Sequence, residues 1–279
     1  MTHPGKRSAL STNFSRTGPD SVVITGASGG LGAALAHAYA GPDTVLGLTG
    51  RDPARLAAVA AACQARGSHV DAAVLDVGDA RAMGAFLDRI WAARPIDLVV
   101  ANAGISAGTR PDGAAEGLDA ATAVVRTNLL GVLNTVEPLL PHMLARGRGH
   151  VAMVASVAAY RGLPDSPAYC ASKAGVRLYG ESLRTALAPH GVSVSVIMPG
   201  FFASAMSDRY LGAQPFKIDL DRAAACVRRG LDARRARIVF PRRLGLLLQA
   251  ADLLPAGLGD RILRLARFCI VPETPPLPR

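Results

Sequence analysis

A tyrosine and a lysine four residues apart are the residues whose types and spacing most clearly suggest chemistry. If Tyr169 and Lys173 lie on a helix, their side chains share one face and stand one turn apart. A free phenol has a pKa of about 10 and is a poor base at neutral pH, but a nearby ammonium group favours the phenolate and lowers that pKa. The pair therefore predicts a tyrosine that exchanges protons near neutral pH. Ser156, thirteen residues before Tyr169, supplies a hydroxyl that could hold a substrate oxygen.

The triplet alone is only suggestive, and a glycine-rich turn near the start of the chain strengthens its functional interpretation. The β-branched run Val22–Thr25 is typical of a strand, and Leu31–Tyr39, after the glycines, is typical of a helix. A strand, a tight turn and a helix N-terminus present backbone N–H groups and the positive end of a helix dipole to a phosphate. The spacing Gly26-x-x-x-Gly30-x-Gly32 differs from the commonest dinucleotide fingerprint, so a plain glycine-rich turn stands as the alternative to a pyrophosphate site.

Taken together, the motifs of this chain resemble those of the short-chain dehydrogenase/reductase family, in its short, single-domain form. The family's marks stand here as Thr25-Gly26…Gly30…Gly32, Asn102-Ala103-Gly104, Asn128, Ser156…Tyr169…Lys173 and Pro199-Gly200. All of them occur in order and at the family's intervals, and the similarity covers roughly residues 20 to 240. The resemblance implies an oxidoreductase that uses a nicotinamide cofactor to interconvert a ketone and a secondary alcohol.

The resemblance also assigns roles to individual residues. Ser156 is expected to bind the substrate oxygen, and Tyr169 to exchange a proton with it. Lys173 is expected to lower the pKa of Tyr169 and to bind the nicotinamide ribose, and Asn128 to hold a water that links Lys173 to solvent. The expected cofactor contacts are Gly26, Ser28, Gly29, Gly30, Leu31, Gly32, Arg51, Asp76, Val77, Asn102, Ala103, Gly104, Tyr169, Lys173, Pro199, Gly200 and Ser204.

The end of the second predicted strand bears on which dinucleotide binds. In folds of this type an acid at this point holds the ribose 2′-hydroxyl of NAD, whereas a nearby arginine accepts the 2′-phosphate of NADP. Here the strand is followed by Gly50, Arg51 and Asp52. A guanidinium group forks well onto phosphate, and Asp52 is placed to cap a helix that begins at Pro53. The sequence therefore predicts NADP(H) as the preferred cofactor, with NAD(H) as the alternative.

Strands and helices alternate along the chain, which predicts an α/β fold. Several predicted strands are nearly unbroken apolar runs, as expected where helices cover both faces of a parallel sheet. The predicted strands are Val22–Thr25, Thr44–Thr49, His69–Leu75, Leu98–Ala101, His150–Val154, Val192–Met198 and Arg237–Phe240. The predicted helices are Leu31–Tyr39, Pro53–Arg66, Ala80–Ala93, Leu118–Ala145 and Pro167–Ala188, the last with Ser166 as its N-cap. Right-handed crossovers then give a three-layer, doubly wound parallel sheet, the Rossmann fold, with about seven strands. This domain is expected to span residues 20–279, after a flexible tail of residues 1–19.

By the resemblance, residues 201–216 are expected to cover the substrate. Phe201, Phe202 and Met206 favour an apolar substrate pocket, although the same side chains could equally pack against the body of the protein. Ser204 stands where the family usually has a threonine that holds the cofactor's carboxamide.

Residues 241–279 depart from the commonest pattern of the family, in which the chain ends soon after the seventh strand. Leu244–Leu248 is apolar, and arginines interrupt the apolar residues between Leu258 and Phe268. A short basic amphipathic stretch of this kind can lie in a membrane interface, cover the active site or form a seam between subunits. The family's usual tetramer is therefore in doubt, and we expect a homodimer or a homotetramer.

Composition limits the other function classes. The formal net charge is +10, and residues 222–279 carry twelve arginines against four acids, but no nucleic-acid-binding signature accompanies them. No nucleic-acid partner is therefore expected, and an arginine-rich solvated face is the alternative to a functional one. The four cysteines form no C-x-x-C pair and the six histidines lack metal-ligand spacing, so we expect reduced thiols and no metal. Without a signal peptide or a membrane span, the expected location is the cytoplasm, with the inner membrane surface as the site of any peripheral contact.

These observations predict an NADP(H)-dependent carbonyl reductase acting on a small molecule. A looser likeness to bacterial reductases of lipid and capsular-polysaccharide pathways favours a lipid-linked or glycan-related substrate. The alternative is a catalytically silent, NADP-binding regulatory protein on the same fold, against which the intact Ser156, Tyr169 and Lys173 argue. A sugar-nucleotide epimerase or dehydratase would need a different glycine spacing and a larger C-terminal domain.

Overall fold

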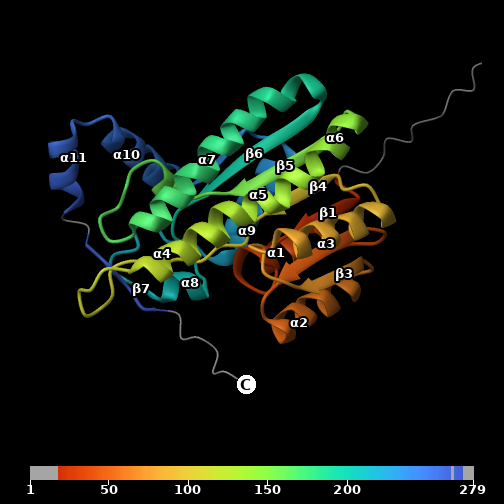
Figure 1. Ribbon diagram of the computed structural model, residues 1–279, viewed down its shortest axis with the longest axis horizontal. Coiled ribbons are helices and arrows are strands. Elements are labelled where there is room, and N and C mark those ends of the chain that lie inside the picture. The colour runs from red at the N-terminus through yellow and green to blue at the C-terminus, as the bar shows by residue number, and fades with distance from the viewer. Residues whose placement is uncertain (1–17, 265–266, 273–279) are drawn as a thin grey trace, which may run out of the picture.

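The fold is built on a sheet of seven parallel strands. The computed structural model describes residues 18–264 and 267–272 (Figure 1). The strand order is β3-β2-β1-β4-β5-β6-β8, so the chain runs outward from β1 in one direction and then returns to build the other half from β4. The strands are β1 (Ser21–Ile24), β2 (Val45–Gly50), β3 (His69–Val74), β4 (Leu98–Ala101), β5 (Gly149–Val154), β6 (Val192–Pro199) and β8 (Arg237–Phe240). This is the doubly wound sheet that the alternating sequence predicts, and its reversal of order lies between β1 and β4.

Helices cover both faces of the sheet and divide its apolar side chains into two cores. On one face Leu35 and Val227 belong to the same buried cluster as Ile24, and on the other Phe86 and Val176 pack with Val99. The first face is covered by α1 (Gly30–Tyr39), α2 (Pro53–Gln64) and α9 (Leu220–Asp232), and the second by α3 (Ala80–Ala93), the run from α4 to α6, and α7 (Pro167–Leu187). The central strands β1, β4 and β5 are buried along their whole length, which is why they read as unbroken apolar runs.

The helix predicted over Leu118–Ala145 is not one regular helix. It consists of α4 (Leu118–Val125), a π-helical turn at Arg126–Leu130, α5 (Gly131–Val136), a 3-10 turn at Glu137–Leu139 and α6 (Leu140–Arg146). The π-helical turn places Asn128 at its middle, and π-bulges of this kind concentrate at functional sites. Sequence periodicity could not show this change because the π-helical turn lies between flanking helical segments.

Ser166 lies at the N-cap position of α7, as predicted, but its side chain does not cap the helix. Its hydroxyl donates instead to the Ala107 carbonyl oxygen at 2.6 Å, and the Ala168 N–H is bound by the Glu116 carboxylate at 3.0 Å. The first turn of α7 is therefore attached to the loop that follows β4, which brings two catalytic segments together.

The chain after β6 adds elements beyond the central sheet. These are α8 (Ala205–Asp208), β7 (Tyr210–Leu211), α10 (Arg242–Asp252), α11 (Ala256–Leu263) and β9 (Cys269–Ile270). In Figure 1, α10 and α11 stand together at one end of the molecule. Beyond α11, β9 returns to pair antiparallel with β7. Residues 1–17 of the predicted N-terminal tail and residues 273–279 of the C-terminal extension lie outside the described residues.

Candidate active site

The glycine turn after β1 is shaped by contacts that leave no room for a side chain. Gly26 has φ 68°, a conformation that residues with a side chain rarely adopt, and a Cβ there would lie 2.8 Å from the Ala103 Cα atom. A Cβ at Gly32 would overlap the carbonyl oxygen of Gly26. Helix α1 begins directly after this turn, and no side chain caps it. Its first N–H groups are therefore available to an anion, so the turn fits a dinucleotide pyrophosphate.

The ends of β1 and β4 are joined by a small network around Thr25. The Thr25 hydroxyl oxygen accepts hydrogen bonds from the backbone N–H groups of Asn102 and Ala103, at 3.0 and 3.1 Å. The side-chain amide of Asn102 donates to the Thr25 carbonyl oxygen at 2.9 Å. Asn102 and Ala103 therefore lie beside the glycine turn, as the predicted cofactor contacts require. Thr25 was missing from the predicted site residues, although it opens the glycine motif.

The residues predicted to determine the choice between NAD and NADP lie at the end of β2. Gly50 packs against Ser28 of the glycine turn, where a Cβ would stand 2.8 Å from the Ser28 Cβ. Arg51 follows it and is exposed. Asp52 caps α2, as predicted, because its carboxylate accepts from the Arg55 backbone N–H at 2.9 Å and from Arg55 Nε at 2.7 Å. The Asp52 carboxylate, next to Arg51 in the chain, is therefore already bound by groups of helix α2.

Two further predicted contacts follow β3. The Asp76 carboxylate accepts from the Gly78 backbone N–H at 2.8 Å, which fixes the turn after the strand. Val77 is buried, and its carbonyl oxygen accepts from the Asn134 side chain at 2.9 Å. Both residues thus stand at the same edge of the sheet as the glycine turn.

The predicted catalytic residues come together from the end of β5, α7 and the loop after β4. Lys173 Nζ donates to the Val154 carbonyl oxygen at 2.8 Å and lies 5.8 Å from the centre of the Tyr169 ring. Ser156 is hydrogen-bonded to Tyr169, and its Oγ also accepts from the Ala158 N–H at 3.1 Å. A Cβ at Gly104 would lie 3.3 Å from Lys173 Nζ, so the Asn102-Ala103-Gly104 segment borders the same group. The sequence prediction that Ser156, Tyr169 and Lys173 face one another agrees with this geometry.

The comparisons with known proteins agree with this geometry. The family model for short chain dehydrogenases matches residues 20–214. An uncharacterized oxidoreductase of Myxococcus xanthus (strain DK1622) is 36% identical over 251 residues, which are 88% of this chain and 96% of that protein. The chain belongs to the short-chain dehydrogenase family. It is an NAD(P)-dependent oxidoreductase that acts on CH–OH groups.

Solved structures of short-chain dehydrogenases share the fold of this dehydrogenase. A short-chain dehydrogenase/reductase from Burkholderia phymatum in complex with NAD has a TM-score of 0.74 at 23% identity, covering 93% of this chain and 98% of that one. A short-chain dehydrogenase from Sphingobium yanoikuyae in complex with NADPH has a TM-score of 0.72 at 23% identity, covering 88% and 96%. At this level of identity the two structures establish the fold.

Asn128 of this dehydrogenase is fully buried, and its side chain is occupied by the loop after β4. Its Oδ1 accepts from the Ile105 N–H at 2.8 Å, and its Nδ2 donates to the Ile105 carbonyl oxygen at 2.9 Å and to Ser172 Oγ at 3.1 Å. The Asn128 side chain therefore holds the Ile105 backbone in place, and the expectation that Asn128 holds a water stays a prediction. These hydrogen bonds fix the loop after β4 beside Lys173. The Asn128 side chain thus positions the loop.

The electrostatics of the catalytic pair differ from the expectation that the lysine brings the phenol near neutral pH. Burial raises the pKa of Tyr169 to about 12, while its hydrogen bond with Ser156 opposes that rise. Burial also lowers the pKa of Lys173 to about 8. Removing water from each group penalises its charged form, which raises the pKa of the phenol and lowers that of the ammonium group. In this dehydrogenase Tyr169 is therefore a neutral phenol throughout the neutral range.

The residues after β6 are placed mainly by packing. The ring of Phe201 meets the ring of Tyr210 edge-on at 4.9 Å, and Phe202 packs against the core that contains α1 and α9. Met206 is partly buried in α8. Ser204 caps α8, since its Oγ accepts from the Ser207 N–H at 3.2 Å. Phe202 therefore packs against the body of the protein, while the substrate role of Phe201 and Met206 stays a prediction.

Pro199 and Gly200, the predicted cofactor contacts at the end of β6, adjoin the catalytic serine. The carbonyl oxygen of Pro199 accepts from Ser156 Oγ at 3.4 Å. The Gly200 N–H donates to the Phe240 carbonyl oxygen at 2.7 Å, which joins the ends of β6 and β8. The chain that leads to Ser204 and Phe201 therefore starts beside Ser156.

Residues 267–271, the C-terminal strap, cross the loops that follow β4 and β6. Asp165 holds the strap: its carboxylate accepts from Arg267 Nε at 2.8 Å, from Arg267 Nη2 at 2.9 Å and from the Phe268 N–H at 3.1 Å. Burial works to raise the pKa of Asp165, but the hydrogen bonds from Arg267, the Phe268 N–H and Thr109 outweigh it and leave that pKa below its ordinary value. Asp165 is therefore a carboxylate at neutral pH.

The strap is also bound to the loops after β4 and β6. The Ile270 N–H donates to the Thr109 carbonyl oxygen at 2.8 Å, and the Val271 N–H donates to the Arg209 carbonyl oxygen at 2.9 Å. The buried ring of Phe268 stacks on Tyr210 at 4.4 Å, and Tyr210 in turn meets Phe201. Sequence reasoning missed this closure, because Asp165 and Arg267 belong to no motif and lie 102 residues apart.

A cavity of about 720 Å³ lies between α7, the loop at residues 161–164 and α11. Cys170, Ala171 and Ala174 of α7 line it, whereas Tyr169 and Lys173 do not. Cys170 thus points to a different side from the catalytic tyrosine, as predicted. The cavity is separate from the catalytic set of this dehydrogenase.

Proposed function

We propose that this dehydrogenase is an NADP(H)-dependent carbonyl reductase that converts a ketone into a secondary alcohol. The proposal rests on one observation: Ser156, Tyr169 and Lys173 converge beside a glycine turn that fits a dinucleotide. The bound nicotinamide supplies the hydride. Ser156 and Tyr169 would both hydrogen-bond the carbonyl oxygen, which fixes the carbonyl group and polarises it.

The protonation state of Tyr169 favours reduction. A phenol with a pKa of about 12 is protonated at neutral pH, which is the form needed to donate a proton to the developing alkoxide. Lys173, with a pKa of about 8, is mostly cationic at pH 7 and stabilises the phenolate that remains after this donation. The reverse reaction needs the phenolate at the start, so it is disfavoured at neutral pH.

The preference for NADP(H) is supported by the residues at the end of β2. Arg51 is exposed beside Ser28 and Gly50, close to the turn that would hold the pyrophosphate. Asp52, which would compete for a ribose hydroxyl, is bound by Arg55 and by the N-terminus of α2. An arginine without a competing free carboxylate suits the 2′-phosphate of NADP.

The substrate class and cellular setting are the least constrained parts of the proposal. The aromatic stack of Phe201, Tyr210 and Phe268 favours a substrate with an apolar portion, such as a lipid-linked intermediate of a lipid or capsular-polysaccharide pathway. We also propose a homodimer or homotetramer in the cytoplasm. The exposed Leu130 and Leu178 on the adjoining α4–α7 face support self-association.

The decisive test is NADPH oxidation over a panel of ketones, comparing the wild-type chain with Tyr169→Phe. Long-chain, cyclic and sugar-nucleotide ketones should be included. Because the variant loses the proton donor, kcat for the ketone that the wild type turns over should fall by roughly 10²- to 10⁴-fold. The Kd for NADPH, measured by fluorescence, should change by no more than about twofold.

Tyr179→Phe is the matched control, because Tyr179 is on the same helix and its hydroxyl donates to the Glu137 carboxylate at 2.7 Å, away from the catalytic set. Its kcat should equal that of the wild type. Normal NADPH binding without turnover of any ketone would instead favour the silent regulatory protein.

The cofactor proposal is tested by substituting Arg51 and comparing kcat/KM with NADPH and NADH. Arg51→Gln removes a charged donor to the 2′-phosphate and should lower the NADPH-to-NADH ratio by roughly 10- to 100-fold. Arg89→Gln is the control, since Arg89 pairs with Asp71 at 2.7 Å and should change that ratio little. A wild-type chain that prefers NADH would contradict the assignment.

A further inference from the structure

Helices α10 and α11 present a surface that the body of the protein does not cover. Five large apolar side chains on this pair are each at least 48% exposed: Leu246, Leu247, Leu253, Leu258 and Ile262. Their exposure is not random, because each helix turns other apolar residues inward, Leu244 on α10 and Leu263 on α11. Large apolar side chains exposed on two neighbouring helices are the kind of surface that marks interaction sites. We call these five residues, with the arginines around them, the hairpin surface.

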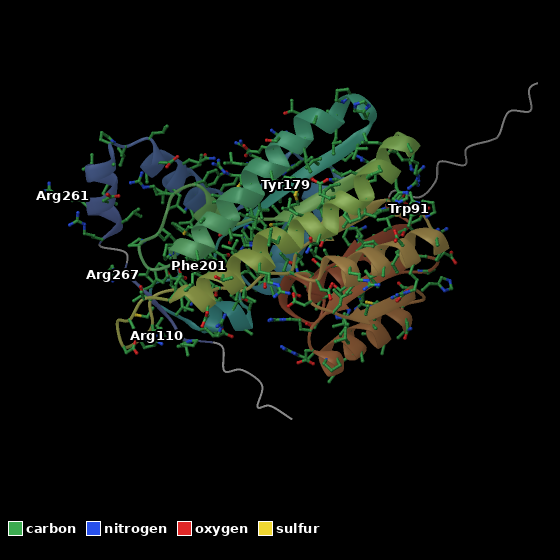
Figure 2. The ribbon with its side chains drawn as sticks, viewed as in Figure 1. Trp91, Arg110, Tyr179, Phe201, Arg261 and Arg267 are labelled. Atoms are coloured by element: carbon green, nitrogen blue, oxygen red, sulfur yellow. The ribbon has the colours of Figure 1, made fainter. Side chains whose placement is uncertain are left out.

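The charges of the hairpin are divided between its two sides. Its acids face the body, where Arg161 binds Asp260 at 2.9 Å and lies 3.9 Å from Asp252. Its arginines are exposed and make no ion pair within the described residues: Arg242, Arg243, Arg261 and Arg264. Figure 2 shows Arg261 on the outer side of α11, pointing away from the sheet. Around the apolar patch the four arginines thus outnumber the two acids, which are both partnered by Arg161.

We propose that the hairpin surface binds the anionic surface of a lipid bilayer. Leucine and isoleucine side chains would enter the boundary between headgroups and acyl chains while the arginines meet lipid phosphates. The spacing supports this, since Arg242 and Arg243 precede Leu246 and Leu247 by one turn and so share their face. No helix among the described residues is long and apolar enough to cross a bilayer, so the contact would be superficial.

A second copy of this chain fits the hairpin surface poorly. A symmetric dimer places the same patch on both partners. The four arginines of one copy would then meet the four of the other, and like charges opposed across an interface are unfavourable. Anionic lipid supplies the charge that the surface lacks.

The hairpin surface adjoins the substrate side of the fold. Arg161, which holds the hairpin, lies four residues before Asp165, which holds the C-terminal strap. A bilayer bound at the hairpin would therefore lie near the segment that holds the C-terminal strap. Lipid binding itself does not depend on the proposed reaction, so it can be tested separately.

The experiment is flotation of the full chain with vesicles of two compositions. One set contains phosphatidylcholine alone, and the other contains phosphatidylcholine and phosphatidylglycerol in equal parts. The chain should float with the anionic vesicles and not with the neutral ones, and binding should weaken as salt is raised. Arg242→Gln/Arg243→Gln should weaken binding by roughly 25-fold, and Leu246→Gln/Leu247→Gln by at least about tenfold.

Matched controls carry the same changes elsewhere on the surface. Arg81→Gln/Arg222→Gln removes two exposed arginines from α3 and α9, and Leu144→Gln removes an exposed leucine from α6. Both should bind vesicles as the wild type does, because neither touches the hairpin. Circular dichroism and the unfolding midpoint test whether each variant is folded. If a double variant is not folded, Leu253→Gln, in the exposed turn between the helices, replaces it in the flotation experiment.

Three results would overturn the proposal. These are equal binding to neutral and anionic vesicles, no binding to either, or hairpin variants that bind no more weakly than the controls. If the hairpin variants instead dissociate an oligomer in size-exclusion chromatography while the wild type ignores vesicles, the surface is a subunit interface.

Discussion

The glycine turn after β1 and the C-terminal strap lie at the same edge of the sheet, but they are held in different ways. The turn is fixed by backbone packed on backbone, at Gly26 against Ala103 and at Gly32 against Gly26. The strap is fixed by side chains, through Asp165 with Arg267 and Tyr210 with Phe268. A site built from backbone contacts admits few residue types, whereas many side-chain pairs could fasten a strap. The cofactor side is therefore expected to be intolerant of substitution, and the substrate side adjustable.

Between the glycine turn and the strap, the larger effect is expected from adding one methyl group to the turn. In Gly32→Ala the new Cβ would overlap the Gly26 carbonyl oxygen, so the turn must move by about 1 Å. A displacement of that size can cost about 10²-fold, and we expect the Kd for NADPH to rise by roughly that factor. The measurement is titration of NADPH fluorescence.

Gly84→Ala provides the comparison for this substitution. Gly84 lies in α3, and a Cβ there meets nothing within 4 Å. Alanine should leave the Kd for NADPH unchanged and raise the free energy of unfolding by up to about 1 kcal/mol through its helix propensity. Equal cofactor affinities in the two variants would show that the turn is as adjustable as the strap.

The difference between a turn fixed by backbone packing and a strap fixed by distant side chains explains which features the sequence could predict. The glycine positions, the strand Leu98–Ala101 and the Asp52 cap depend on neighbours in the chain or on residue types that few alternatives replace. The apolar runs likewise predicted the central strands, because burial on both faces selects such runs, whereas the edge strand β3 is partly exposed along its length.

What could not be predicted depends on contacts between distant segments. The hydroxyl of Ser166 binds Ala107 rather than its own helix, and Asn128 binds Ile105 through a π-helical turn that leaves no mark in the residue pattern. The pKa of Tyr169 likewise could not be predicted from the sequence. Its rise is caused by burial, which the four-residue spacing to Lys173 cannot reveal.

Lys173 and Tyr169 lie between the glycine turn and the C-terminal strap, and the pH dependence of ketone reduction measures their protonation. Lys173 has a pKa lowered to about 8, so its positive charge is present below pH 8 and lost above it. Tyr169 stays protonated to about pH 12, so the lysine titrates first. We expect the rate of ketone reduction to be level below pH 8 and to fall about tenfold between pH 8 and 9.5.

Lys173→Met is the variant that sharpens this measurement. Without the ammonium group, the rate should already be low at pH 7 and should show no fall near pH 8. A wild-type profile that stays level to pH 10 would mean that the lysine charge is not needed for proton donation.

The smallest effect is expected at the strap. Arg267→Ala removes both guanidinium hydrogen bonds to Asp165, but Thr109 and the Phe268 N–H still bind that carboxylate. Because the arginine side chain is 63% exposed, water competes for its hydrogen bonds, and the arginine adds little to the grip that the other two donors keep on Asp165. The strap should therefore loosen without detaching, and KM for the ketone should rise about fivefold while kcat and the Kd for NADPH stay within about twofold. Arg110→Ala, at an exposed pair with Asp112 on the neighbouring loop, should change KM by less than about twofold. A rise in the Kd for NADPH equal to the rise in KM would show that the strap and the glycine turn are coupled, and the division between a fixed cofactor side and an adjustable substrate side would then be wrong.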